Sequence, residues 1–89
     1  MQTVGQRIRK LRVEYHKLTQ RELADQISST QKSVVDWEND IYLPSPKHLQ
    51  NLSVTLGVLV DYLLTGSKEI WTRDLRSGIL KPPRSVRLK

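Results

Sequence analysis

Three residues, "SST" at positions 28–30, separate two stretches with helical spacing, and this short connection constrains the fold more than any other feature. The first stretch, "TQRELADQI", opens with a capping box formed by Thr19 and Glu22. The second, "STQKSVVDWE", is capped by Ser29 or Thr30. A turn this short cannot let the helices run antiparallel, and it sets them at roughly 90–120° to each other. We therefore expect the second helix to protrude from the domain.

The side chains of this second helix are unusual for the surface of a small domain. Val34 and Trp37 can share one buried stripe, while the rest presents an amide, an ammonium, hydroxyls and a bare valine. An α-helix fits the major groove of B-DNA, where side chains near its N-terminus meet base edges. Gln31 suits the N6/N7 edge of adenine, Lys32 can donate to guanine, and Val35 offers methyls to thymine. The pattern predicts a helix-turn-helix that binds double-stranded DNA.

Caps and apolar spacing predict further helices on either side of this pair. Apolar residues recur every three or four positions over residues 3–16, behind a Thr-x-x-Gln capping box. Ser45 caps a later helix whose first position is proline, and Gly57 ends it. The apolar stretch "VLVDYLL", residues 58–64, closes at Gly66. No alternating β pattern occurs up to this point, so the predicted fold class is all-α, a compact domain of five helices.

Length and charge indicate one small domain followed by a basic extension. The chain has 89 residues, a net charge of +6 and a pI near 10.0, with positive charge at both ends and a slightly acidic middle. We expect the domain to span residues 1–66. Residues 67–89 are expected to form a short helix around Trp71 and Leu75 and then an extended basic tail, as a linker or a dimer contact. Nucleic acid is a common partner of basic proteins, although on charge alone a solvated surface is an equal explanation.

Several classes of function find no support in the sequence. There is no cysteine, and His16 and His48 lack partners at metal-ligand spacing, so no disulfide, metal or cofactor is expected. No Ser/His/Asp set, paired carboxylates or glycine-rich phosphate loop indicates an enzyme. No basic-then-apolar leader opens the chain, and no apolar run approaches the ~20 residues that span a bilayer. We expect a cytoplasmic protein, associated with the nucleoid when bound to DNA.

The order of these segments resembles a known family. "RIRKLR", "LTQRELADQ", "STQKSVVDWEN", "LPSPKHLQNLSVTLGV" and "VDYLLTG" are jointly similar to the five-helix DNA-binding domain of lambda-type phage repressors and Cro proteins, also called the Xre family. The resemblance covers residues 4–66. It implies a sequence-specific transcriptional regulator, expected to be a repressor of phage or bacterial origin. Such a protein binds a palindromic operator as a homodimer, here with residues 30–38 in the major groove.

The resemblance also implies roles for individual side chains. Those expected to contact base edges are Gln31, Lys32, Val35 and Asp36. Those expected to contact phosphates are Gln20, Thr30, Ser33, Asn39 and Lys47. Among them, Ser33 is assigned from the chemistry of its hydroxyl. The resemblance also implies that Gln20 braces Gln31. Apart from the resemblance, which ends at residue 66, we expect a dimer contact that involves Leu59, Tyr62 and Trp71. Arg12 and Glu38 match a mostly buried ion pair between the first helix and the end of the third.

The sequence departs from the family pattern at several positions. Ser28 stands where the family has a left-handed glycine, at a cost of about 1 kcal/mol. Leu59 replaces a serine N-cap, which costs roughly 1 kcal/mol, and we expect this leucine to serve a dimer contact instead. The turn "EYHK", residues 14–17, is one residue longer than usual. Asp40 stands where relatives often carry basic side chains that bind phosphates. We expect the basic tail to compensate for these missing phosphate contacts.

Two alternatives stay open at the level of the sequence. The domain could be an antitoxin-type interaction module that autoregulates by binding DNA, with a protein partner on residues 59–89. The chain could also be the N-terminal half of a longer repressor, with "KPPRSVRLK" as a linker to an oligomerising or self-cleaving domain.

Overall fold

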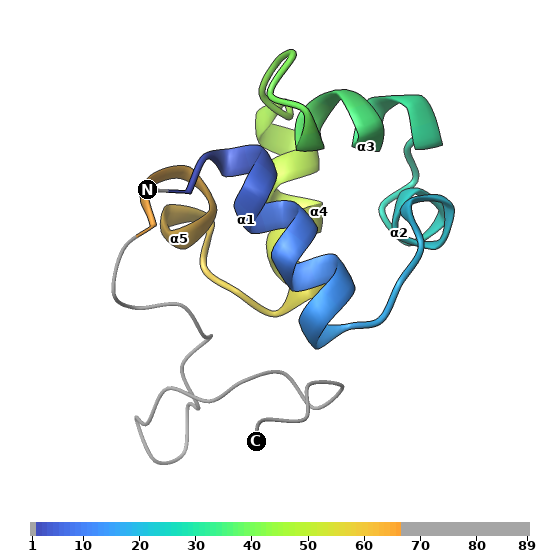
Figure 1. Cartoon of the computed structure of the whole chain (residues 1–89), viewed down its shortest axis with the longest axis horizontal. Coiled ribbons are helices and arrows are strands. Elements are labelled where there is room, and N and C mark those ends of the chain that lie inside the picture. The colour runs from blue at the N-terminus through green and yellow to red at the C-terminus, as the bar shows by residue number, and fades with distance from the viewer. Residues whose placement is uncertain (1, 67–89) are drawn as a thin grey trace.

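The computed structural model describes residues 2–66, and these residues form helices joined by short turns (Figure 1). In chain order the elements are α1 (Val4–Lys10), the π-helical turn η1 (Leu11–Tyr15), α2 (Gln20–Gln26), α3 (Gln31–Glu38), α4 (Pro46–Leu56) and α5 (Val60–Thr65). The predicted all-α fold with five α-helices is confirmed for this part of the chain. The extension, with Trp71 and Leu75, lies outside the described residues.

The helices enclose one core around α1. In Figure 1, α1 runs through the centre, α5 lies to its left, α2 to its right, α4 behind it and α3 at the upper right, above α2. Each helix buries one apolar stripe, as expected for surface helices of a small domain. The buried apolar residues are Ile8, Leu11, Leu23, Ala24, Ile27, Val34, Trp37, Leu49, Leu52, Leu56, Val58 and Leu63. Burial of these stripes against one another is the main force that holds the short helices together.

The helix ends lie at the capping residues that the sequence indicates. Thr3 and Thr19 each form a complete capping box. The hydroxyls of Thr30 and Ser45 accept the backbone N–H three residues later. The residues that end α4 and α5 in the left-handed conformation, both with φ 70°, are Gly57 and Gly66. Leu59 begins α5 without a side-chain hydrogen bond, as its apolar side chain requires.

Arg7 supplies a polar contact at the other end of α5. Its side chain is buried, and Nε donates to the carbonyl of Leu63 at 3.0 Å while Nη2 donates to that of Leu64 at 3.0 Å. Nη1 donates to the carbonyl of Gln2. The last carbonyls of a helix have no partner within the helix, and a cation there also complements the helix dipole. Arg7 therefore fixes α5 against α1 and is not part of a solvated basic face.

The first helix differs from the prediction in its last turn. The sequence predicts one regular helix over residues 3–16, whereas the segment after Lys10 is π-helical. The N–H of His16 donates to the carbonyl of Leu11 at 3.1 Å, an i→i+5 bond. A π turn holds one more residue than an α turn closed by the same kind of bond. We infer that the extra residue relative to the family pattern is accommodated in η1, before the connection to α2 begins.

Ser28 adopts the left-handed conformation that the resemblance implies, with φ 57°. Such a conformation strains a residue with a Cβ by about 1–2 kcal/mol and does not strain glycine. We expect Ser28→Gly to raise the free energy of unfolding by about 1 kcal/mol, measured by urea denaturation. The matched control is Ser29→Gly, because the neighbouring serine has no positive φ and should lose stability or stay unchanged. Equal effects at the two serines would contradict the strain at Ser28.

The capping box of α2 makes one contribution to stability depend on pH. The N–H of Thr19 donates to Glu22 Oε1 at 2.8 Å, and the N–H of Glu22 donates to Thr19 Oγ1 at 3.0 Å. The hydrogen bond from the backbone N–H of Thr19 lowers the pKa of Glu22 the most, and the hydrogen bond with the Thr19 side chain lowers it further. A folded-state pKa below the unfolded one means that this stabilisation is present above the unfolded pKa and is lost as pH falls through the folded pKa.

We expect a side-chain NMR titration to place the pKa of Glu22 below that of an unfolded glutamate. Thr19→Ala should raise the pKa of Glu22 only in part, because the backbone N–H of residue 19 remains after the substitution. An unchanged pKa in this variant would show that the Thr19 hydroxyl does not act on the carboxylate.

Candidate nucleic-acid interface

Helix α3 lies across the surface of the domain, directly after the short turn that follows α2 (Figure 1). Its inner face is buried, with Val34 at 0% and Trp37 at 2% exposure. Its outer face exposes Gln31 and Lys32 at the start of the helix. Val35 and Asp36, the other two residues predicted to contact bases, are half-buried. All four side chains lie on α3, whose inner face is buried. A helix that enters a groove needs this geometry.

At the N-terminus of α3, the hydroxyls of Thr30 and Ser33 are hydrogen-bonded to each other. Thr30 Oγ1 accepts the N–H of Ser33 at 3.2 Å, and its hydroxyl donates to Ser33 Oγ at 3.0 Å. Because each hydroxyl has one donor hydrogen, this contact uses one of the two and leaves the other for an outside acceptor. The pair can therefore offer one hydroxyl donor to a phosphate while the cap stays intact.

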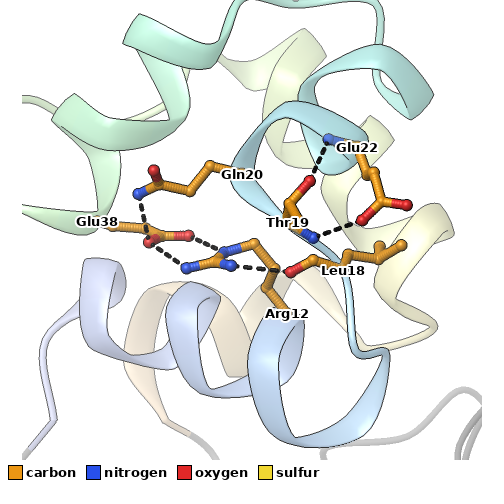
Figure 2. A network of polar contacts seen from close by, with 6 residues as sticks. All are labelled: Arg12, Leu18, Thr19, Gln20, Glu22 and Glu38. Atoms are coloured by element: carbon orange, nitrogen blue, oxygen red, sulfur yellow. Dashed lines mark hydrogen bonds and ion pairs between the residues drawn. The ribbon is translucent and has the colours of Figure 1, made fainter.

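A buried polar network joins α3 to η1 and α2 (Figure 2). Arg12 Nε donates to Glu38 Oε2 at 2.6 Å and Nη2 donates to Glu38 Oε1 at 3.0 Å, with side chains 10% and 4% exposed. Arg12 Nη1 also donates to the carbonyl of Leu18 at 2.8 Å. The ion pair that the resemblance implies is thus present, and it is bidentate. It fixes the end of α3 and the start of α2 on the same guanidinium.

Gln20 extends this network from the first position of α2. Its Nε2 donates to Glu38 Oε1 at 3.1 Å, and Figure 2 shows its carbonyl oxygen pointing away from Glu38. A side-chain amide has two donor hydrogens, so one remains for a phosphate after this bond is made. The phosphate contact of Gln20 and its bracing of Gln31 stay predictions, because the observed partner of its amide is Glu38.

Asp40 has a structural role that the sequence does not reveal. Its Oδ1 accepts the N–H of Gly5 at 3.0 Å and its Oδ2 accepts the hydroxyl of Thr3 at 2.6 Å. A carboxylate is favoured at the N-terminus of a helix, where N–H groups lack partners within the helix. The carboxylate of Asp40 is therefore directed to the start of α1. It ties the end of α3 to α1 through a residue with φ 60°.

The rest of the loop between α3 and α4 exposes a short apolar run. The residues and their exposures are Ile41 at 68%, Tyr42 at 48% and Leu43 at 60%. The residues on either side with phosphate-binding groups, Asn39 and Lys47, are both exposed. The predicted phosphate contacts of Asn39, at the end of α3, and of Lys47, in the first turn of α4, are therefore open to solvent on either side of this loop.

The residues expected at a dimer contact are described only in part. Leu59 is half-buried at the start of α5, and Tyr62 is half-buried and packed against the core. Trp71 lies outside the described residues. A homodimer through these side chains stays a prediction.

The two histidines have structural partners. His16 Nε2 lies 2.8 Å from the carbonyl of Leu56, at the end of α4. His48 Nδ1 lies 3.0 Å from Ser45 Oγ, and its ring is centred 5.2 Å from that of Trp37. Within residues 2–66, no group of three or more potential ligands is placed to hold a metal ion. Over the same range, every helix is too short or too polar to cross a membrane.

Comparison with known proteins extends these observations. A family model described as helix-turn-helix matches residues 8–63. The chain is similar to the P22 c2 repressor solved in complex with synthetic operator 9T, with a TM-score of 0.72 and 31% identity over 75% of this chain and 100% of that one. It is also similar to the N-terminal DNA-binding domain of SinR from Bacillus subtilis, with a TM-score of 0.66 and 30% identity over 74% of this chain and 96% of that one. A third similar structure is the restriction-modification controller protein C.AhdI from Aeromonas hydrophila, with a TM-score of 0.63 and 26% identity over 68% and 91% of the two chains. No curated protein matches the chain.

Proposed function

The chain belongs to the helix-turn-helix family whose model covers residues 8–63, and we propose on this premise that it is a sequence-specific, DNA-binding transcriptional regulator. The observation that carries the proposal is α3, which buries Val34 and Trp37 and presents Gln31 and Lys32 to solvent. A polar outer face of this kind contributes little to packing but offers the donors, acceptors and methyls that base edges match. Repression is the mode of regulation that we expect, as for the P22 c2 repressor, which is solved in complex with synthetic operator 9T.

In the proposed complex, α3 enters the major groove with its N-terminus toward the bases. Gln31 contacts an adenine edge and Val35 packs on a thymine methyl. The expected phosphate contacts come from the polar groups around the helix, which are Gln20, Thr30, Ser33, Asn39 and Lys47. These contacts set the position of α3 and make affinity fall with rising salt, because bound phosphates release their counterions.

We further propose that the protein acts as a homodimer on a palindromic operator in the cytoplasm, at the nucleoid. Two-fold symmetry requires two recognition helices one turn of DNA apart, with half-sites centred roughly 10–10.5 base pairs apart. Leu59 and Tyr62 on the α5 side of the domain are the described residues proposed for the dimer contact. No catalytic activity is proposed, since the described side chains support DNA binding.

The test is selection from a randomised duplex library at two salt concentrations, followed by sequencing of the bound fraction. We expect an enriched inverted repeat whose binding weakens at the higher salt. Gln31→Ala should lose discrimination of about 1–3 kcal/mol at one position of each half-site. Gln50→Ala removes an exposed glutamine from α4 and should leave the selected sequence unchanged. An unaltered preference after Gln31→Ala would remove this residue from the proposed interface.

A second candidate is a protein-interaction module of the antitoxin type that also binds its own control region. The observation that favours it is a structural relative, SinR, which is solved in complex with the SinI protein and shares 30% identity over 71% of this chain. A partner protein that copurifies with the chain and binds residues 59–89 would favour this candidate.

A further inference from the structure

Two of the residues expected to contact bases are bound to each other. Lys32 Nζ lies 3.1 Å from Asp36 Oδ2, one helical turn along α3, with side chains 84% and 17% exposed. The lysine extends through solvent, whereas the carboxylate is held among its neighbours. The backbone at Asp36 is also fixed, because its carbonyl accepts the N–H of Ile41 at 2.9 Å. The ion pair and its partial burial therefore restrict the carboxylate of Asp36 to a place beside Lys32.

A carboxylate on this face needs an explanation if the face binds DNA. It is repelled by phosphates and by the acceptor atoms that dominate the major-groove edges of guanine and thymine. The only donors in that groove are the N4 amino group of cytosine and the N6 amino group of adenine. Asp36 is compatible with close approach of α3 only where one of these amino groups faces it.

The pair leaves a definite set of hydrogen-bonding groups for a ligand. An ammonium has three donor hydrogens and a carboxylate accepts only, through two oxygens. One hydrogen of Lys32 and one lone pair of Asp36 Oδ2 are used in the bond between them. Two donor hydrogens of Lys32 then remain next to a carboxylate that can still accept. The matching edge presents two acceptors beside one donor.

One base pair has this edge in the major groove. Guanine offers N7 and O6 as acceptors, and the N4 amino group of its paired cytosine lies beside O6. We propose that Lys32 and Asp36 together recognise a single G·C base pair in each half-site, with Lys32 donating to guanine and Asp36 accepting from cytosine. This inference rests on the proposed function, since it places the same helix in the same groove.

The other base pairs match the two side chains less well. A reversed C·G pair puts the amino group against the ammonium and the acceptors against the carboxylate. In A·T the single donor lies between two acceptors, so Lys32 loses one bond and Asp36 lies close to O4 of thymine. We expect guanine to be preferred about tenfold or more over each alternative, the size of one good bidentate contact.

The test extends the library selection to matched variants. The wild type should select G·C at one position of each half-site, and Asp36→Ala should reduce that preference about tenfold while the rest of the motif is retained. Asp25→Ala removes an exposed carboxylate from α2 and controls for the change of net charge. The exchange variant Lys32→Asp with Asp36→Lys keeps both the charge and the pairing, and it should select C·G at the same position.

The possible results separate this inference from the function on which it rests. A selected inverted repeat without this G·C pair overturns the inference and leaves the proposed function intact. Equal effects of Asp36→Ala and Asp25→Ala, limited to overall affinity, also overturn it and reduce the pair to a helix-stabilising contact. Selection of no sequence at all by the wild type overturns the proposed function itself.

Discussion

Glu38→Ala is expected to lower the free energy of unfolding by about 3–5 kcal/mol, because it leaves the Arg12 guanidinium buried without its counter-charge. The Arg12 side chain is 10% exposed and gives two of its hydrogen bonds to Glu38. After the substitution only the bond to the Leu18 carbonyl remains among those described for it. Gln20 also loses its acceptor. A domain of this size has a small margin of stability, so most of that margin would be lost.

Urea denaturation followed by circular dichroism measures this effect, and a double replacement tests its origin. Arg12→Met combined with Glu38→Leu removes both charges and refills the space, so it should cost far less than the two single losses together. Glu14→Ala removes an exposed carboxylate from η1 and should change stability by no more than about 0.5 kcal/mol. A cost below about 1 kcal/mol for Glu38→Ala would be typical of a solvated surface pair and would contradict a buried one.

The helices could be predicted because the signals that define them are local. The capping box of Thr19 and Glu22 lies within one helical turn of the chain. The end of α4 is indicated by a single residue, the left-handed Gly57. Apolar spacing of three and four residues then indicates which stripe of each helix is buried. None of these signals depends on a distant part of the chain, and a single sequence contains all of them.

The contacts that join the helices could not be predicted from such local patterns. Arg7 binds the carbonyl of Leu63, 56 positions away, and Asp40 binds Gly5, 35 positions away. Both are charged residues, and in a sequence charge indicates a solvated face. Apolar spacing also does not reveal the π turn η1, because the spacing over residues 3–16 is compatible with an α-helix throughout.

The residue types of the candidate site can be proposed from the sequence, whereas the pairing of side chains within it cannot. The mixed side chains of Gln31, Lys32 and Val35 indicate base contact from sequence alone, and the family resemblance adds the pair of Arg12 and Glu38. The sequence could not show that Lys32 and Asp36 share a hydrogen bond, because i,i+4 spacing permits such a bond without requiring it.

Gly5→Ala is the second substitution with a large expected effect, a loss of about 3 kcal/mol in the free energy of unfolding. A Cβ at this position would lie 2.3 Å from the carbonyl oxygen of Trp37, 2.7 Å from that of Glu38 and 2.8 Å from Asp40 Oδ1. The first two atoms are backbone at the end of α3, so they cannot rotate away as a side chain would. Gly5 has no positive φ, and glycine is therefore needed for space and not for conformation.

The expected loss combines three contributions. Overpacking costs about 1–3 kcal/mol and sometimes more, and displacing Asp40 removes a helix cap worth about 1 kcal/mol. The better helix propensity of alanine returns up to about 1 kcal/mol. Thermal and urea denaturation measure the sum, with Arg9→Ala on the exposed face of α1 as the control. A loss below about 1 kcal/mol would mean that α1 and α3 can separate at little cost. Such separation would displace the buried end of α3, and with it the helix that presents Gln31 and Lys32 to DNA.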